Sequence, residues 1–119
     1  MIMAKERRVF ITQIPRSNKK IGGETKVWMP TVNIGPANEF GEIVEMFPSR
    51  SSFHMSKELS ELCWNKLQDF DPNIDHLLPM GDNFISATCC AILGKRFGYF
   101  NVLKWDKNLG RYLNTKVVI

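Results

Sequence analysis

IDHLLPMGDNFISATCCAILGKRFGYFNVLKW, residues 74–105, contains a short apolar strand (74–80), a helix and a second strand (100–105) in that order. Asp82 or Asn83 suits the N-cap of the helix, because a short polar side chain there accepts hydrogen bonds from the first free N–H groups. Gly98 suits the position just past the helix end, where a left-handed conformation is common. Strand, helix and strand in this order predict two parallel strands joined by a right-handed crossover.

A second unit of the same kind precedes it. Residues 42–47 are expected as a strand that stops at Pro48, and residues 55–70 as a helix that begins near Ser56. The apolar residues of this helix recur at the spacing of one helical face, which predicts a buried stripe. The stripe consists of Leu59, Leu62, Cys63, Leu67 and Phe70. Two successive units predict a parallel βαβαβ centre.

The ends of the chain complete the expected sheet. We predict a strand over 9–14, a flexible loop or hairpin tip over 15–26, a short strand over 31–34 and a turn over 35–38. At the other end, residues 106–110 are expected to form the loop of a C-terminal hairpin, closed by a strand over 111–119. The predicted fold is a single α/β domain over residues 1–119, with a mixed sheet of five to six strands and two helices. If both crossovers run in one direction, both helices cover one face, and the other face is covered or partly polar at Glu45, Lys104, Asn114 and Lys116.

Composition excludes several classes of protein. The chain has 119 residues, of which 44% are hydrophobic and 24% charged, which is typical of one soluble domain and not of a disordered or disulfide-dense chain. No apolar run reaches the ~20 residues that span a bilayer, and no signal-peptide core follows the N-terminus, so we expect a cytoplasmic protein without membrane contact. The three cysteines, Cys63, Cys89 and Cys90, are expected to be buried free thiols, and no Cys-x-x-Cys pair suggests a metal. We therefore expect no metal and no cofactor.

Charge is unevenly distributed along the chain. Residues 1–26 carry seven basic and two acidic residues. Residues 27–93 carry three basic and nine acidic residues, and residues 94–119 carry six basic residues and one acidic residue. If the two basic ends meet in space, they form a patch suited to nucleic acid. The alternative is that lysines at sheet edges only guard against aggregation. The residues of the hypothetical patch are Arg7, Arg8, Arg16, Lys19, Lys20, Lys104, Lys107, Arg111 and Lys116.

A ligand site in an open α/β sheet lies at the carboxyl ends of the parallel strands. The hypothetical ligand-binding residues at those ends are Arg50, Ser51, Ser52, His54, Gly81, Asp82, Asn83 and Trp105. Arg50 and the two serines precede a helix N-terminus and could hold a phosphate, or they could form an ordinary polar turn. Asp82 could be a metal ligand or base, or only a helix cap, and His54 an acid–base group or a surface histidine. Trp105 could stack on a base.

No catalytic residue can be assigned. The chain lacks the glycine-rich nucleotide loops, and no Ser-His-Asp or Cys-His triad is defensible. Trp64 lies off the apolar stripe of its helix, so it is expected to be partly exposed, either as an anchor for a partner or packed against a loop. The protein is therefore more readily a binding protein than an enzyme.

Several segments together resemble small uncharacterised proteins encoded in bacteriophage genomes. They are VFITQIP (9–15), PTVNIGPA (30–37), FGEIV (40–44), LPMGD (78–82), VLKWD (102–106) and RYL (111–113). The resemblance implies a viral accessory protein in a host bacterial cytoplasm. We therefore expect a non-catalytic protein that binds a host protein or nucleic acid, and an exposed sheet face would allow a homodimer. The alternative is a binder or hydrolase of a nucleotide-like phosphate ligand at the strand ends.

Overall fold

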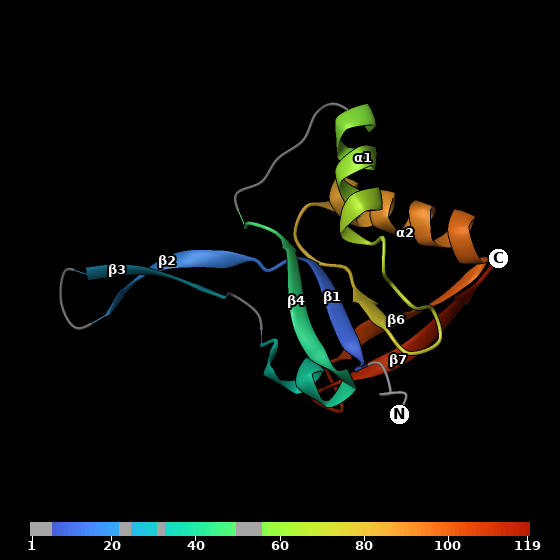
Figure 1. Cartoon of the computed structure of the whole chain (residues 1–119). Coiled ribbons are helices and arrows are strands. Elements are labelled where there is room, and N and C mark those ends of the chain that lie inside the picture. The colour runs from blue at the N-terminus through green and yellow to red at the C-terminus, as the bar shows by residue number, and fades with distance from the viewer. Residues whose placement is uncertain (1–5, 22–24, 31–32, 50–55) are drawn as a thin grey trace, which may run out of the picture.

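The computed structural model describes residues 6–21, 25–30, 33–49 and 56–119, and for residues 17–21 and 25–30 it describes the backbone. Five strands form one sheet in the order β4-β1-β5-β6-β7 (Figure 1). The first four run parallel, and β7 pairs antiparallel with β6. These strands are β1 (Arg8–Gln13), β4 (Glu42–Phe47), β5 (His76–Leu78), β6 (Tyr99–Asp106) and β7 (Arg111–Val118).

The predicted α/β fold, with its parallel centre and C-terminal hairpin, is confirmed, and the first strand lies inside the parallel centre. The sequence left the order of the strands open; β1 lies between β4 and β5 and pairs with both. The reason is burial, because Val9, Phe10 and Ile11 are at most 2% exposed. A strand that is apolar on both faces is most stable at the centre of a sheet.

The connections cover both faces of the sheet because the chain reverses direction at β4, the edge strand. It moves from β1 to β4 on one side and then back past β1 to β5 and β6, and right-handed crossovers in opposite directions cover opposite faces. Helices α1 (Ser56–Lys66) and α2 (Asn83–Phe97) lie together on one face, as expected (Figure 1). The 3-10 helix η1 (Gly35–Phe40) covers the other face, and residues 35–38 belong to it instead of forming a simple turn.

Alternate strand residues contribute to two separate cores. The core under the helices contains Phe10, Met46, Phe47, Leu59, Cys63, Leu67, Phe70, Leu77, Ile85, Cys89, Leu93 and Phe100. The core under η1 contains Val9, Ile11, Ile14, Ala37, Leu78, Leu103 and Tyr112. The four polar strand residues predicted to face solvent, Glu45, Lys104, Asn114 and Lys116, are exposed.

A two-stranded arm projects from this body. Strands β2 (Arg16–Ile21) and β3 (Thr25–Pro30) pair antiparallel and form a sheet of their own (Figure 1). The prediction of a loop over 15–26 is therefore wrong for most of that range, although a hairpin is present. The β-forming residues that follow the glycines extend the pairing well beyond a tip. Of the strand expected at 31–34, residues 33 and 34 are not in a strand, and 31–32 lie outside the described residues.

Both helices begin and end for identifiable reasons. The Asp82 carboxylate caps α2, and Gly98 ends it with a φ of +77°, as the sequence predicts. The Arg96 guanidinium donates to the Leu67 and Gln68 carbonyl oxygens, at 2.7 and 3.1 Å. These hydrogen bonds satisfy carbonyl groups in the turn that follows α1. This interaction, together with a turn over 67–69, ends α1 four residues earlier than predicted.

The contact between the helices is apolar at its centre. The Cys89 thiol donates to the Cys63 sulfur at 3.6 Å, and both side chains are fully buried. This hydrogen bond raises the pKa of Cys89 and lowers that of Cys63. All three cysteines are free thiols, and Cys90 is half-buried. The expectation of buried free thiols is thus confirmed for two of the three.

Arg8 and Asp75 hold the amino end of β1. The buried Asp75 carboxylate accepts hydrogen bonds from the Arg8 and Asp71 backbone N–H groups, at 3.0 and 2.8 Å, and from the Arg8 guanidinium at 3.2 Å. Arg8 also pairs with Asp69 at 2.9 Å, but that carboxylate is 68% exposed. The two ion pairs share one cation and differ mainly in burial.

We expect Asp75→Asn to lower the free energy of unfolding by about 3 kcal/mol, because it removes a fully buried charge and turns one of its two accepting oxygens into an N–H donor that faces other N–H groups. Asp69→Asn is the matched control and should cost less than about 1 kcal/mol, since exposed pairs contribute little. Urea denaturation of the three proteins measures both values. Equal losses for the two variants would contradict the assignment.

His76 is buried without a partner for one ring nitrogen. Its ring packs against Phe40 at 5.4 Å between centroids, and Nδ1 has no hydrogen-bond partner among the described residues. Burial, and then the positive charge of Arg7, lower the pKa of His76 below its ordinary 6.5. The folded protein therefore holds this imidazole neutral.

Because the unfolded chain takes up a proton near pH 6.5 that the folded protein does not, stability should fall as pH drops below that value. The contribution is complete above about pH 6.5 and has a slope of at most about 1.4 kcal/mol per pH unit. His76→Gln should remove this slope from urea-denaturation series between about pH 5.5 and 7.5. His54→Gln, which changes the other histidine, should leave it intact, and the reverse result would contradict the prediction.

Candidate functional site

The crevice at the carboxyl ends of β1 and β5 is closed by a glutamine. In this strand order the chain leaves these two strands in opposite directions, which is where α/β proteins bind ligands. Here the Gln13 amide donates to the Pro48 carbonyl at 2.8 Å and accepts from the Asp82 N–H at 2.7 Å. Gly81 has a φ of +80°, and a Cβ there would collide with Gln13 Oε1. Gln13 thus occupies the space that a ligand would need.

The N-terminus of α2 is likewise occupied. Asp82 Oδ1 accepts from the Phe84 and Ile85 N–H groups, at 2.8 and 3.4 Å. The Thr12 hydroxyl bonds both backbone groups of Met80, at 2.7 Å to the oxygen and 2.9 Å from the nitrogen. Of the two roles considered for Asp82, the geometry shows the cap. Gly81 and Asn83 form the turn and the first residue of the helix beside it.

The phosphate-binding loop expected before α1 lies outside the residues that the structure describes. Arg50, Ser51, Ser52 and His54 all fall in the range 50–55. The described chain stops at Ser49 after β4 and resumes at Ser56 in α1. Their proposed role in holding a phosphate therefore stays a prediction.

Trp105 lines a hollow at the carboxyl end of β6, which we call the Trp105 hollow. Its volume is about 260 Å³, and it is lined by Asn33, Met80, Trp105 and Tyr112. The Trp105 ring is 38% exposed and forms a T-shaped pair with the Tyr112 ring, with centroids 4.9 Å apart and an angle of 67° between the ring planes. The Tyr112 hydroxyl donates to the Asn33 carbonyl at 2.9 Å, and burial raises the pKa of this phenol. The exposed indole therefore rests on a fixed neighbour.

Part of the predicted basic patch is engaged in contacts within the protein. Arg8 pairs with Asp69 and Asp75, and Arg16 forms a bidentate ion pair with Glu45, with hydrogen bonds of 2.6 and 2.8 Å. Arg111 lies 3.9 Å from Glu39. The Lys116 ammonium lies 4.8 Å from the centroid of the Tyr99 ring. These four residues brace the fold as well as adding positive charge.

The basic residues separate into two groups at opposite ends of the sheet. Parallel strands end at one edge, so residues near strand starts and strand ends cannot share a patch. The first group lies near the amino ends of β1 and β6 and consists of Arg7, Arg8 and Lys116. The second group lies at the carboxyl ends of the strands or on the arm, and it consists of Arg16, Lys19, Lys20, Lys104, Lys107 and Arg111.

Lys104 and Lys107 are exposed, and neither forms an ion pair with a described residue. On the arm, strand register sets Lys20 directly opposite Lys26 and Lys19 opposite Val27. We call β2 and β3 the basic arm because Arg16, Lys19, Lys20 and Lys26 lie on it. Lys26 was absent from the predicted patch and enters it through this pairing.

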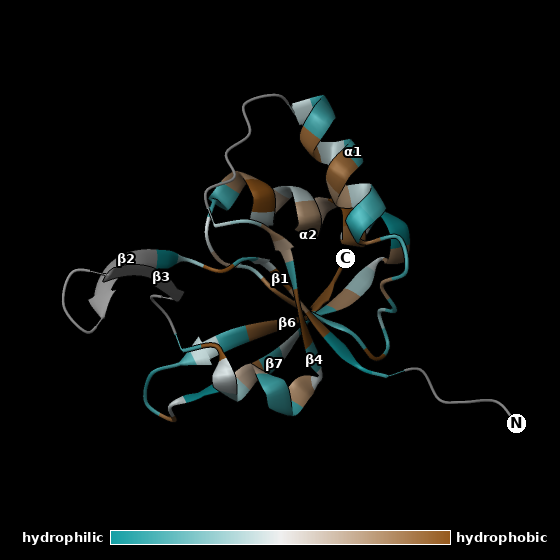
Figure 2. Ribbon diagram, turned by 60° about the vertical axis from the view of Figure 1, so that its left-hand side comes forward, coloured by the Kyte–Doolittle hydropathy of each residue, from teal (hydrophilic) through white to brown (hydrophobic). Residues whose placement is uncertain are grey.

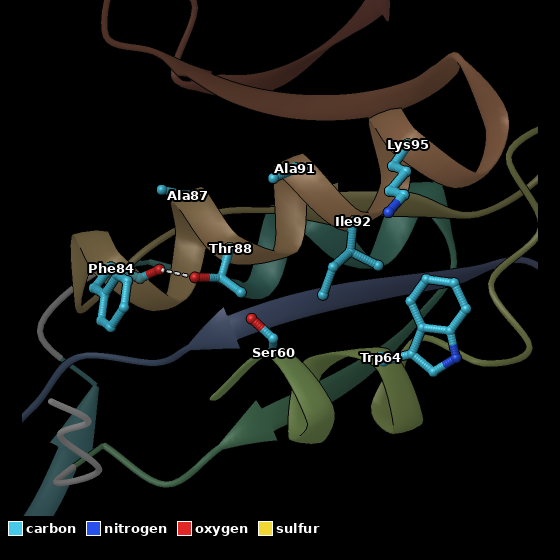
Figure 3. A pocket seen from close by; sticks show the side chains of 8 residues that line it. All are labelled: Ser60, Trp64, Phe84, Ala87, Thr88, Ala91, Ile92 and Lys95. Atoms are coloured by element: carbon cyan, nitrogen blue, oxygen red, sulfur yellow. Dashed lines mark hydrogen bonds between the residues drawn. The ribbon is translucent and has the colours of Figure 1, made fainter. Parts of the chain in front are cut away.

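A second hollow lies between the helices, which we call the helical groove. It has a volume of about 490 Å³ and is drawn in Figure 3. Trp64 is 46% exposed, as predicted, and Phe84 is 39% exposed. The groove is lined by Ser60, Trp64, Phe84, Ala87, Thr88, Ala91, Ile92 and Lys95.

Sequence reasoning found Trp105 but missed its neighbours and the glutamine. Tyr112 and Asn33 carry no local signal, because each acts on a residue far away in sequence. The polar pair Thr12 and Gln13 at the end of an otherwise apolar strand is the one hint that the chain offered. Within the described part of the chain, no group of three or more His, Cys, Asp or Glu residues could hold a metal, and no helix is long and apolar enough to cross a membrane.

Comparison with known proteins places the chain in a family. Neither the curated proteins nor the solved structures include a match to it. Residues 7–119, nearly the whole chain, match the family described as Phage Pam3 gp32-like protein. The match confirms the resemblance to phage-encoded proteins. The chain belongs to the Phage Pam3 gp32-like protein family, and it is a bacteriophage protein.

Proposed function

We propose that this phage protein is a non-catalytic accessory protein that binds single-stranded nucleic acid at the Trp105 hollow and along the basic arm. The observation that carries the proposal is the exposed Trp105 indole, which packs against Tyr112 and is followed in the turn by the exposed Lys107. Proteins that bind single strands combine aromatic platforms for the bases with cations for the backbone. The carboxyl end of β6 has both.

Trp105 suits base stacking because part of its ring is open and its position is fixed. An exposed indole held by a buried tyrosine keeps one orientation, so little conformational freedom is lost when a base stacks on it. Met80 lines the same hollow and adds apolar surface beside the ring. Duplex bases have no free face, so this platform favours an unpaired strand.

A cation lies next to this platform in the turn. Lys107 follows the tryptophan there, whereas Lys104 precedes it by one residue in β6 and so points to the opposite face of the sheet. On the arm, strand register sets two cationic positions, Lys20 and Lys26, at one level of the hairpin. A polyanion that follows the arm would therefore meet cationic residues from both strands.

The arm and the hollow are close enough to act on one strand. β3 ends at Pro30, and Asn33 already lines the hollow. Three residues span at most about 10 Å. One bound strand could therefore contact Trp105 and the base of the arm together.

Side chains of the protein itself fill the carboxyl ends of the parallel strands, which favours a binding role over catalysis and over a nucleotide pocket. Gln13 fills the crevice between β1 and β5, and Asp82 accepts from the first N–H groups of α2. A phosphate would have to displace both side chains. The nucleotide-binding alternative therefore depends on the undescribed residues 50–55.

We expect Trp105→Ala to weaken binding of a labelled single-stranded oligonucleotide, measured by fluorescence anisotropy, by about 5- to 150-fold, the loss of about 1–3 kcal/mol per stacked base. Trp105→Phe should retain most of the affinity, because a phenyl ring still stacks. Trp64→Ala is the matched control, since this tryptophan is equally exposed but lies in the helical groove. Absence of binding at low salt, or equal loss in both alanine variants, would refute the proposal.

The lysines should be visible in the salt dependence. Lys104→Gln combined with Lys107→Gln should reduce the slope of log affinity against log salt by about 1.4, since each lost phosphate contact on a single strand removes about 0.7. A control with the same change in net charge is Lys57→Gln combined with Lys66→Gln on α1. If both double variants lower the slope equally, the charge acts at long range and the two lysines make no local contact.

A further inference from the structure

Helix α2 has more apolar surface than the fold buries. Residues 83–94 contain no charged side chain, and the first charges are Lys95 and Arg96 near the C-terminus. Ile85, Cys89 and Leu93 pack into the core. A helix that is apolar on all sides is normally covered on all sides. Figure 2 shows the contrast, with much teal on α1 and mostly brown to white on α2.

The uncovered side of α2 is the helical groove. Ala87 and Ala91 are exposed along it, and Phe84 and Trp64 remain 39% and 46% exposed at its two ends. Figure 3 shows Phe84 at one end and Trp64 with Lys95 at the other, with the alanines between them. Small residues between larger ones let the backbone of another helix approach closely. The groove therefore fits a helix with an apolar face.

We propose that the occupant of the helical groove is a second copy of this chain, with the two α2 helices antiparallel across a two-fold axis. The proposal uses neither Trp105 nor the basic arm, so it is independent of nucleic-acid binding. The first argument is charge. One end of α2 carries Asp82 and the other carries Lys95 and Arg96, so antiparallel packing sets each acidic end beside the partner copy's basic end. The helix dipoles then also oppose each other.

The second argument is symmetry. Ala87 and Ala91 lie two positions to either side of residue 89, and Asn83 and Lys95 lie six positions to either side. An antiparallel pair centred at that level sets each Ala87 against the partner copy's Ala91, and each Lys95 next to the partner copy's Asn83. A two-fold contact needs this reciprocity, in which residue i meets j and j meets i.

The two ends of the groove also complement each other in shape and chemistry. Arg96 lies over the Trp64 ring, with its guanidinium carbon 5.1 Å from the ring centroid, which holds the indole against α2. In the antiparallel pair the Phe84 ring of one copy meets the end with Trp64 and Lys95 of the other. Aromatic pairs and cation–ring contacts are both favourable there.

The test is the mass in solution of the full chain, measured by sedimentation velocity over a range of concentrations. We expect the wild-type protein to be a dimer and Ala91→Glu to be a monomer, because a long charged side chain would replace a small residue at the contact and prevent the two helices from approaching closely. Ala87→Lys should be a monomer for the same reason. Gln68→Glu, an exposed position outside the groove, is the control and should leave the dimer intact.

The double variant Ala87→Lys with Ala91→Glu tests whether the two α2 helices are antiparallel or parallel. In the antiparallel pair each new cation meets a new carboxylate of the partner copy, so dimerisation should return in part, whereas in a parallel pair like charges would meet. Thermal melts of every variant establish that it is folded. The proposal is overturned by a wild-type protein that stays monomeric at about 1 mM, where even a weak dimer is populated. It is equally overturned by a dimer that Ala91→Glu leaves intact, or by a double variant that stays monomeric.

Discussion

Burial of β1 on both faces is the constraint on which the rest of the structure depends. A strand whose residues from Val9 to Gln13 are all buried needs a neighbour on each edge and a cover on each face. The two long helices cover one face only. The other face is covered by η1, and the Tyr112 hydroxyl bonds the Asn33 carbonyl just before it. The position of η1 thus follows from the place of β1 in the sheet.

How much the sequence could predict depended on the range of the interactions. Asp82 and Gly98 predict the two ends of α2, because a capping residue acts on backbone groups only a few residues away. The insertion of β1 between β4 and β5, and the contact of Gln13 with a residue 69 positions away, carry no local signal. Trp105 was found because the carboxyl end of a parallel strand is a general location for sites. Its support by Tyr112 was not found, because it depends on strand register.

The two exposed tryptophans mark surfaces of different chemistry. Trp64 lies in a groove whose other walls are mostly apolar, and Arg96 holds it from below. Trp105 packs against Tyr112 at the strand ends, and Lys107 follows it in the β6–β7 turn. An apolar groove recognises a folded surface, whereas a cationic platform recognises a flexible polyanion. The two proposals thus assign one surface to self-association and the other to nucleic acid, and neither needs the other to be correct.

The hydrogen bond from Tyr112 to Asn33 has a consequence for the strength of binding. It fixes the chain three residues after the end of β3, so the arm and Trp105 are joined by a very short connection. Two weak contacts joined in this way behave as a chelate, since a strand held by one contact meets the other at an effective concentration in the millimolar range. Breaking this one phenol contact would lengthen the connection and lower that concentration, even though the phenol need not touch the bound strand.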